Sequence, residues 1–190
     1  RAGFLQFEES VRAMQAGQSS NSLTIAAPRD FTAKWLAARL ATFSKANPDT
    51  RFTLVAADEL VDFTEANLDL AIRLTTGPGE HEGVKLAAGA HVTVAAPEGG
   101  AETPISWPNC PVADGVAALR LADAGLAIDA AAIGLGRATV PLLLAEADLA
   151  SGKIRAVDNA KESEEAYWLV APLPQWRQKK VKALVEALTQ

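Results

Sequence analysis

Cysteine and long apolar runs are scarce in this sequence. Its 190 residues include one cysteine, Cys110, so no disulfide can form within the chain and no cluster of cysteines can bind a metal ion. No apolar run approaches the roughly 18–20 residues that cross a bilayer, and the first residues are too polar for the core of a secretory signal. These absences favour a reducing compartment, and we expect a cytoplasmic protein.

Basic residues are outnumbered as well. The chain has 18 Lys and Arg against 23 Asp and Glu, a net charge of −5. Binding to DNA or to an anionic membrane needs a clustered basic footprint. The one basic run holds Arg177, Lys179, Lys180 and Lys182 in the last expected helix, which is typical of a solvated helix face. We therefore expect that this chain itself binds neither DNA nor a membrane.

No motif nominates a catalytic residue, a metal ligand or a cofactor loop. His81 and His91 have no neighbours at metal-ligand spacing. The Gly-Leu-Gly at 134–136 follows an expected helix instead of opening one, unlike a dinucleotide-binding loop. A nucleophile-elbow motif is missing, and scattered carboxylates do not make an acid/base pair. We expect no enzyme and no cofactor.

Strand-like and helix-like patterns alternate along the chain, which predicts crossover units and parallel strands. A flexible linker is expected at 17–22, and the four prolines and two glycines of 97–111 indicate a boundary between two lobes. Strands are expected at 23–27, 51–56, 68–74, 84–88, 91–96, 137–142, 154–157 and 166–171, and helices at 4–14, 31–46, 58–66, 114–121, 126–133, 143–150 and 175–190.

Several segments, taken in order, resemble the effector-binding half of LysR-type bacterial transcriptional regulators. They are LTIAAPRDFTAKWLAARLATFSKANPDTRFTL, LDLAIRL, VTVAAP, AIDAAAIGLGRATVPLLLAEADLASGKI and AYWLVAP, and together they cover most of residues 23–172. The resemblance implies an α/β fold of two Rossmann-like lobes, as in type 2 periplasmic binding proteins. The stretch 98–125 is condensed relative to the family, so the second lobe is expected to be shortened and to contribute less to a ligand cleft.

The resemblance also implies an organisation. Residues 1–22 would be the end of a linker helix and the linker, 23–96 plus 168–190 the first lobe, and 97–167 the second, with hinges near Ala96 and Trp168. The chain would be a fragment or processed product that binds DNA only through a winged helix-turn-helix domain missing here. In the family, the helices at 31–46 and 140–149 meet across an antiparallel homodimer, so a homodimer or higher oligomer is expected. Burial of both helices within one lobe is the alternative.

The turn after the first strand is the strongest local candidate for ligand binding. The N-terminus of a helix that follows a parallel strand offers free N–H groups and favours an anion. Arg29 and Thr32 could hold a carboxylate there, together with Asp30 and Phe31 of the same turn. Alternatively, Asp30 caps the helix and competes with a ligand for those donors, and Arg29 lies at the surface. A small carboxylate is the expected effector.

Further candidates lie at other strand ends and helix starts. Asp58 is a ligand contact or a helix cap, and Asp114 opens an expected helix of the second lobe. Arg73 and Thr75 lie near a strand end where the family contacts ligand, although Arg73 could instead pair with Asp69 on the same strand face. Two other functions remain open: a periplasmic solute-binding protein of the same fold, and an enzyme on a related two-lobed scaffold.

Overall fold

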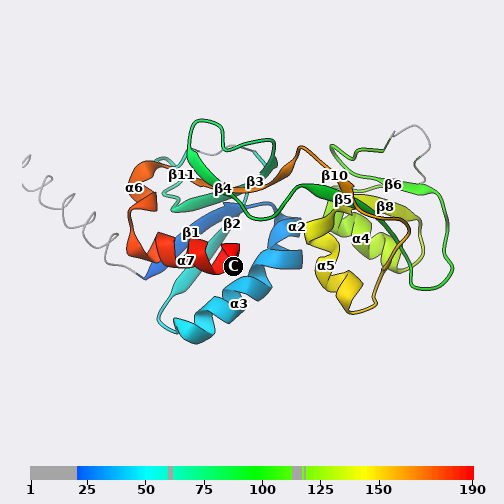
Figure 1. Ribbon diagram of the computed structural model, residues 1–190, viewed down its shortest axis with the longest axis horizontal. Coiled ribbons are helices and arrows are strands. Elements are labelled where there is room, and N and C mark those ends of the chain that lie inside the picture. Colours follow the sequence, from blue (N-terminus) through cyan, green and yellow to red (C-terminus); the bar gives the residue numbers. More distant parts are fainter. Residues whose placement is uncertain (1–20, 60–61, 113–116, 118) are drawn as a thin grey trace, which may run out of the picture.

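The chain forms two α/β lobes, each built around one β-sheet (Figure 1). The computed structural model describes residues 21–59, 62–112, 117 and 119–190. Two sheets of mixed direction flanked by helices confirm the expected two-lobed α/β class. The helix expected at 4–14 and nearly all of the linker expected at 17–22 lie outside the described residues.

The sheet of lobe I has the order β2-β1-β3-β11-β4. β1 is parallel to both of its neighbours, whereas β11 is antiparallel to β3 and β4. The alternating Leu23 and Ile25 of β1 are fully buried, as expected of a central strand that is covered by helices. The strands are β1 (Ser22–Ala27), β2 (Arg51–Ala56), β3 (Leu70–Thr75), β4 (Glu82–Lys85) and β11 (Ala166–Ala171).

Two helical segments complete lobe I. The first is continuous from residue 29 to 46 and consists of α2 (Arg29–Phe31), the π-helical turn η1 (Thr32–Leu36) and α3 (Ala37–Ala46). The second is α6 (Leu173–Trp176) followed by α7 (Lys179–Thr189), so the single helix expected at 175–190 is divided near residue 178. α7 packs through Val181, Leu184 and Leu188, an apolar stripe with helical spacing.

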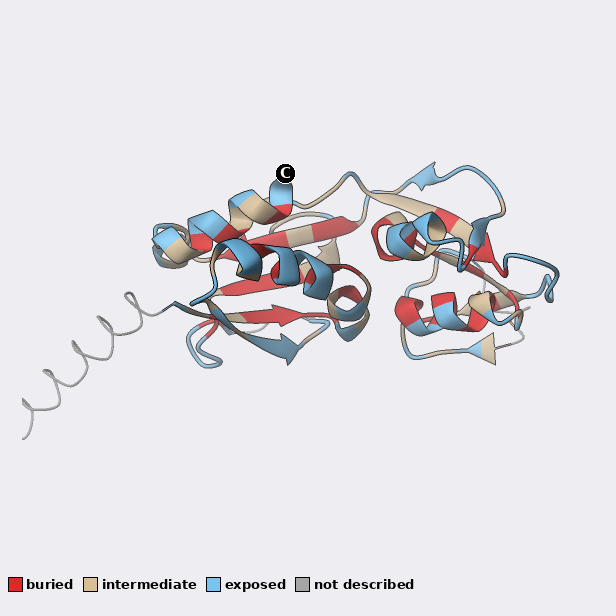
Figure 2. Ribbon diagram, turned by 90° about the horizontal axis from the view of Figure 1, so that it is seen from below, coloured by how far each residue is buried: buried red, intermediate tan, exposed pale blue. Residues whose placement is uncertain are grey.

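Lobe II has a sheet of order β10-β5-β8-β6-β7, with β9 also paired to β5. Helices α4 (Ala124–Ala132) and α5 (Leu142–Ala150) pack on it. Val94, Val140 and Leu144 are fully buried. Figure 2 shows that the helices and strands of lobe II carry buried segments as well as exposed ones. The strands are β5 (Ala90–Ala95), β6 (Pro104–Ser106), β7 (Leu119–Arg120), β8 (Arg137–Pro141), β9 (Arg155–Ala156) and β10 (Lys161–Glu162).

Two expected helices are wrong over the residues that the structure describes. In 58–66, residues 63–66 form only a turn: the Asp62 carboxylate caps it by accepting the backbone N–H groups of Thr64 and Glu65 at 2.9 Å, and it ends at Asn67, whose φ is 53°. In 114–121, Leu119–Arg120 is the strand β7, which pairs with β6 in the proline-rich stretch expected to be a boundary between the lobes.

The chain crosses between the sheets earlier than the expected hinges at Ala96 and Trp168. β4 and β5 are consecutive in sequence but belong to different sheets, so the first crossing lies at 86–89 and the second, between β10 and β11, at 163–165. The crossings run side by side, with Ser163 N–H donating to the Gly89 carbonyl at 3.0 Å. A Cβ on Gly89 would lie 2.3 Å from the Ser163 oxygen, so this close approach requires glycine.

Candidate functional site

A cavity of about 300 Å³ lies between the two lobes. It is placed outside the carboxyl end of β1, where open α/β sheets bind their ligands. Lobe II contributes six of the lining residues, so its condensed sequence does not remove it from the cleft. The lining comprises Pro28, Asp30, Asp58, Glu59 and Leu74 of lobe I, Trp107, Pro108, Asn109, Ala122, Asp123 and Ala124 of lobe II, and Glu165 and Tyr167 of the second crossing and β11.

Asp30 stands at the N-terminus of the 29–46 helix and reaches across the cleft. Its carboxylate accepts the N–H of Phe31 at 2.8 Å and that of Gly125, the second residue of α4, at 3.3 Å. Burial raises the pKa of Asp30, and the nearby Asp123 raises it further, whereas the hydrogen bonds from Phe31 and Gly125 act in the opposite direction. A carboxylate of the chain itself therefore occupies the donors at which an anionic ligand was expected.

Asp123 is a second carboxylate at a helix N-terminus, that of the facing helix α4. It is the N-cap of α4, and its Oδ1 accepts the N–H of Leu126 at 2.8 Å. The helix of Asp30 and α4 thus point their N-termini at one another across the cavity, and each carries its own carboxylate. The positive ends of both helix dipoles are already offset.

Tyr167 forms part of the wall next to these carboxylates. Its ring packs on Phe31, with centroids 4.5 Å apart, and the residue is only 4% exposed. No hydrogen bond to its hydroxyl occurs among the described residues, although the residue lines the cavity. Burial raises its pKa well above the usual value, and the charges of Asp30 and Asp123 add to this, so the hydroxyl keeps its proton.

Lys34 ties the lobes together beside the cavity. It lies in η1, and its Nζ is 2.6 Å from Asp129 Oδ1 of α4 and 3.1 Å from Asp148 Oδ2 of α5. Burial alone would lower the Lys34 pKa, but the hydrogen bonds to the two carboxylates raise it. The ammonium therefore stays charged at neutral pH and holds both helices of lobe II against lobe I.

The structure separates the four residues predicted at the first turn. Asp30 lines the cavity, whereas Arg29 is exposed and is not among the lining residues. Phe31 is fully buried behind Tyr167. Thr32 is half-buried, and its N–H donates within the helix to the Pro28 carbonyl at 3.0 Å.

Among the other predicted residues, Asp58 lines the cavity, whereas Arg73 and Thr75 are half-buried on β3 and do not. The Nε of Arg73 and the indole Nε1 of its cross-strand partner Trp168 are buried without a described hydrogen-bond partner. Asp114 lies outside the described residues.

The expected ion pair between Asp69 and Arg73 is wrong. Asp69 instead accepts the N–H of Thr24 at 2.8 Å and lies 3.6 Å from Nζ of Lys180. Side chains four residues apart on a strand are about 13 Å apart, which is too far for a direct pair.

Sequence reasoning missed most of the lobe II wall. Asp123 carries a usable signal, because it is a cap residue directly before an apolar helix, as in the first turn. Trp107, Glu165 and Tyr167 have no such signal in the local sequence, because they come to line the cavity only where the chain crosses between the sheets.

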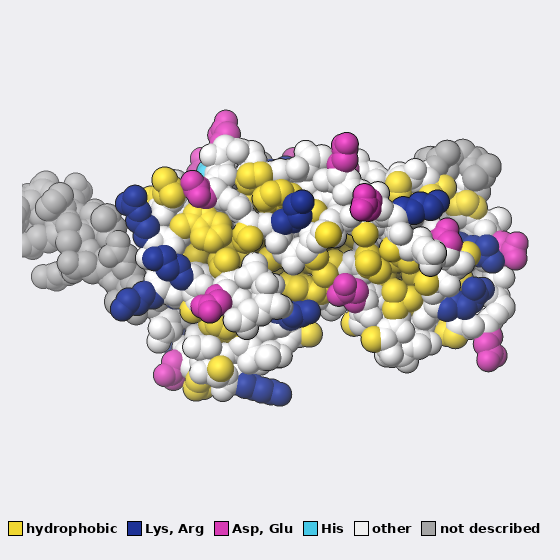
Figure 3. All heavy atoms as spheres, viewed as in Figure 1, with side chains coloured by type: hydrophobic (Ala, Val, Ile, Leu, Met, Phe, Trp, Pro, Cys, Tyr) yellow, Lys and Arg dark blue, Asp and Glu magenta, His cyan; other side chains and the backbone are white. Residues whose placement is uncertain are grey.

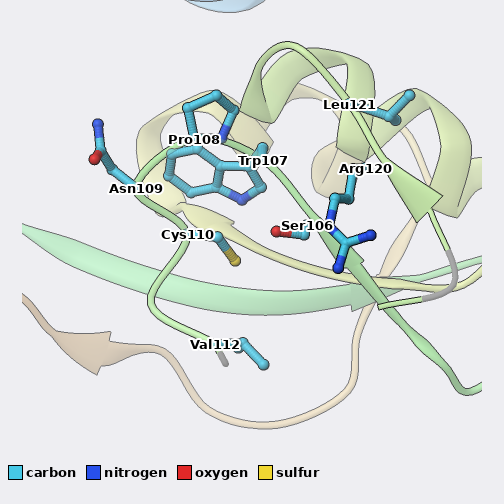
Figure 4. A pocket seen from close by; sticks show the side chains of 8 residues that line it. All are labelled: Ser106, Trp107, Pro108, Asn109, Cys110, Val112, Arg120 and Leu121. Atoms are coloured by element: carbon cyan, nitrogen blue, oxygen red, sulfur yellow. The ribbon is translucent and has the colours of Figure 1, made fainter. Parts of the chain in front are cut away.

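Lobe II holds a second cavity of about 360 Å³ (Figure 4). The segment of Trp107, Pro108 and Asn109 lines both cavities and so separates them. The indole is held in place by a hydrogen bond from its Nε1 to the Thr139 carbonyl at 2.9 Å. Cys110, Arg120 and Leu121 belong to the second cavity alone.

Neither a metal site nor a membrane-spanning helix occurs in the described part of the chain. No group of three or more His, Cys, Asp and Glu side chains is arranged to hold a metal ion. No described helix is both long and apolar enough to cross a membrane.

Comparisons with known proteins agree on one family. Residues 16–110 match the LysR substrate binding domain. The AhcY transcriptional activator HvrB of Rhodobacter capsulatus is 37% identical over 98 residues, which are 50% of this chain and 33% of that protein. The chain thus matches about a third of the length of this relative.

Solved structures share the fold over almost the whole chain. The effector domain of the transcriptional regulator AmpR of Pseudomonas aeruginosa has a TM-score of 0.70 at 21% identity, covering 88% of this chain and 93% of that chain. The CrgA regulatory domain, a LysR-type transcriptional regulator from Neisseria meningitidis, has a TM-score of 0.71 at 14% identity, covering 90% and 98%. With half of its residues matching the family model and its two lobes arranged as in these effector and regulatory domains, the chain belongs to the LysR substrate-binding domain family.

Proposed function

We propose that this domain senses a small molecule bound between its lobes and passes the signal to an attached DNA-binding domain. The observation that carries the proposal is the cavity of about 300 Å³ lined by both lobes. A ligand in that position contacts both walls only when the lobes are close together. It therefore binds the closed arrangement more tightly than an open one and shifts the population toward it.

The contacts across the cleft suit such an equilibrium. Asp30 with Gly125, and Lys34 with Asp129 and Asp148, link the lobes in addition to the two chain crossings. These polar contacts contribute only a few kcal/mol. Apolar packing also joins the lobes where η1 lies on α5 and α2 on α4, so a ligand shifts the equilibrium by adding its own contacts to those already present.

We also propose that the domain works as a homodimer or higher oligomer. β2 is an edge strand whose residues are mostly exposed, and Leu54 and Val55 are each 38% exposed. Beside it, α3 presents the exposed Ala37, Ala38 and Ala41. An exposed edge strand next to a helix face of small apolar residues is a surface suited to a second copy.

DNA contact belongs, in this proposal, to a winged helix-turn-helix domain outside this sequence. The net charge of −5 supports this division. On the face shown in Figure 3, basic side chains are spread over both lobes and interspersed with acidic ones, and they form no continuous basic patch.

A thermal-shift screen of amines, carboxylates and neutral metabolites tests the proposed sensing, with small-angle scattering on each hit. We expect at least one compound to raise the melting temperature and to reduce the radius of gyration. Substituting Asn109→Ala in the cavity should weaken that response, whereas Asn159→Ala on the surface should not. Hits whose effect is unchanged by Asn109→Ala and by every other cavity substitution would contradict the proposal.

A further inference from the structure

The charge of the cleft differs from what the sequence led us to expect. Five carboxylates line the cavity, those of Asp30, Asp58, Glu59, Asp123 and Glu165, and its lining contains no Lys, Arg or His. None of the five has an ion-pair partner among the described residues. Carboxylates gathered without a counter-charge repel one another, more strongly in a cleft than in open water.

Tyr167 gives an independent indication that the cavity receives a ligand. A tyrosine hydroxyl that is buried in a protein usually has a hydrogen-bond partner. Tyr167 is only 4% exposed and lines the cavity, and its hydroxyl makes no hydrogen bond among the described residues; the oxygen itself is not fully enclosed, so a ligand in the cavity can reach it. The hydroxyl can accept a hydrogen bond from a donor in the cavity, and an ammonium or guanidinium group is such a donor.

We propose that the effector is an organic cation, an amine or a guanidinium compound, held between the carboxylates of both lobes and the Tyr167 hydroxyl. This inference rests on the function proposed above. Trp107 adds an aromatic face to the lining, which favours a cation as well. The cation supplies a full counter-charge to Asp30 and Asp58 of lobe I and Asp123 of lobe II, in addition to the partial charge of the helix N-termini, and so favours closure.

Two other occupants fit the lining less well. A metal ion needs ligands converging on one point, and no described group of three or more side chains does so. An anion would face five carboxylates, and three of the N–H donors at the two helix N-termini are already taken, those of Phe31 and Gly125 by Asp30 and that of Leu126 by Asp123. A carboxylate effector would have to displace the chain's own carboxylates.

The test compares three probes of equal chain length, putrescine, butanediol and succinate, together with the guanidinium compound agmatine. Calorimetric titration at low salt measures their affinity for the unmodified domain. We expect both cations to bind, and to bind more weakly as salt increases because exposed charges are screened. Butanediol and succinate should not bind.

Substitutions of residues that line the cavity test whether the amine binds there. Asp58→Asn should weaken amine binding about 3- to 10-fold and Tyr167→Phe by a similar factor, because each removes one charge-assisted hydrogen bond. The matched control Glu162→Gln removes an exposed carboxylate that does not line the cavity, and it should leave the affinity unchanged. Circular dichroism and melting curves establish that each variant is folded.

The outcomes separate the two proposals. Succinate binding that Asp58→Asn strengthens and Asn109→Ala weakens would overturn the cationic effector and leave sensing in the cleft intact. Failure of both amines to bind would also overturn the cationic effector, and the broader screen would then decide on sensing. Amine binding that is insensitive to both Asp58→Asn and Tyr167→Phe would place the cation elsewhere and likewise overturn the inference.

Discussion

Asp30 of lobe I lies directly against the backbone of Gly125 in lobe II, whose N–H donates to Asp30 Oδ2 at 3.3 Å. A Cβ built on Gly125 would lie 2.7 Å from the Cβ of Asp30 and 3.4 Å from its Cα. Real side chains essentially never approach so closely, so the arrangement of the lobes in this structure requires glycine at position 125. A single added methyl group therefore tests the proposed closure.

Gly125→Ala should hold the lobes apart without unfolding them. Alanine favours a helix over glycine by about 1 kcal/mol, so α4 itself should not suffer. The clash with Asp30 should disfavour the closed state by about 1–3 kcal/mol. Small-angle scattering should show a larger radius of gyration, and effector affinity should fall roughly 10-fold or more.

Gly77→Ala is the control for this substitution, because no atom lies within 4 Å of a Cβ there and the backbone does not require glycine. Gly77→Ala should leave both the radius of gyration and the effector affinity unchanged. A Gly125→Ala domain as compact as its parent, with equal affinity, would show that the lobes close in some other way.

Lys34→Met should also loosen the cleft. The side chain of Lys34 is 14% exposed, and its loss leaves Asp148 half-buried without its cation. We expect a loss of about 1–2 kcal/mol of unfolding free energy. Chemical denaturation measures it, and Lys45→Met, at an exposed position of the same helix, should change it by less than about 0.5 kcal/mol. Equal losses of unfolding free energy at the two positions would mean that the ion pairs of Lys34 stabilise the domain no more than an exposed lysine does.

The sequence predicted the layers of this fold better than its cleft. The strands and most helices follow from apolar periodicity, which is local: Leu23 and Ile25 alternate in β1, and Val181, Leu184 and Leu188 repeat along α7. The helix expected at 58–66 is wrong because Asp62 caps only a single turn, which ends at Asn67 in a left-handed conformation that periodicity does not reveal.

The cleft depends on neighbours that are distant in sequence. Asp30 was expected to cap its helix or compete with a ligand, and it does accept its neighbour's N–H, but its second bond goes to a residue 95 positions away. The acidic character of the cavity arises only when lobe II and the second crossing bring Asp123 and Glu165 next to Asp30 and Asp58. No pattern within one segment carries that information.

Dimerisation is open to a direct test. Ala37 is exposed on α3, so Ala37→Glu should place a charge in the proposed interface while leaving the fold intact. Analytical ultracentrifugation should show a dimer for the parent domain at micromolar concentration and at least a roughly 10-fold weaker association for the variant. Ala160→Glu, in an exposed loop of lobe II, is the matched control. A parent domain that sediments as a monomer at this concentration would refute the proposed homodimer.

Amine affinity should fall as the pH is lowered. Burial and the charge of Asp123 raise the pKa of Asp30, so this carboxyl takes up a proton earlier than an ordinary aspartate and loses its attraction for a cation. Burial lowers the pKa of His91, although the charge of Glu165 acts in the opposite direction, so His91 becomes a competing cation at a lower pH than an ordinary histidine does. Both changes lower the affinity for an amine as the pH falls, and the Tyr167 hydroxyl stays protonated throughout.

Calorimetric titration of putrescine between about pH 8 and about pH 5 measures this dependence. Affinity should be highest at the alkaline end and should decline as Asp30 is protonated and His91 gains its charge. Asp30→Asn keeps an oxygen that can accept the N–H groups of Phe31 and Gly125 but cannot titrate. Its affinity should be lower at the alkaline end and should vary less with pH, whereas His91→Gln should remove only the part of the decline that comes from His91. An affinity that is constant or rises toward acidic pH in the parent domain would mean that the ionised carboxylates of the cleft do not hold the ligand.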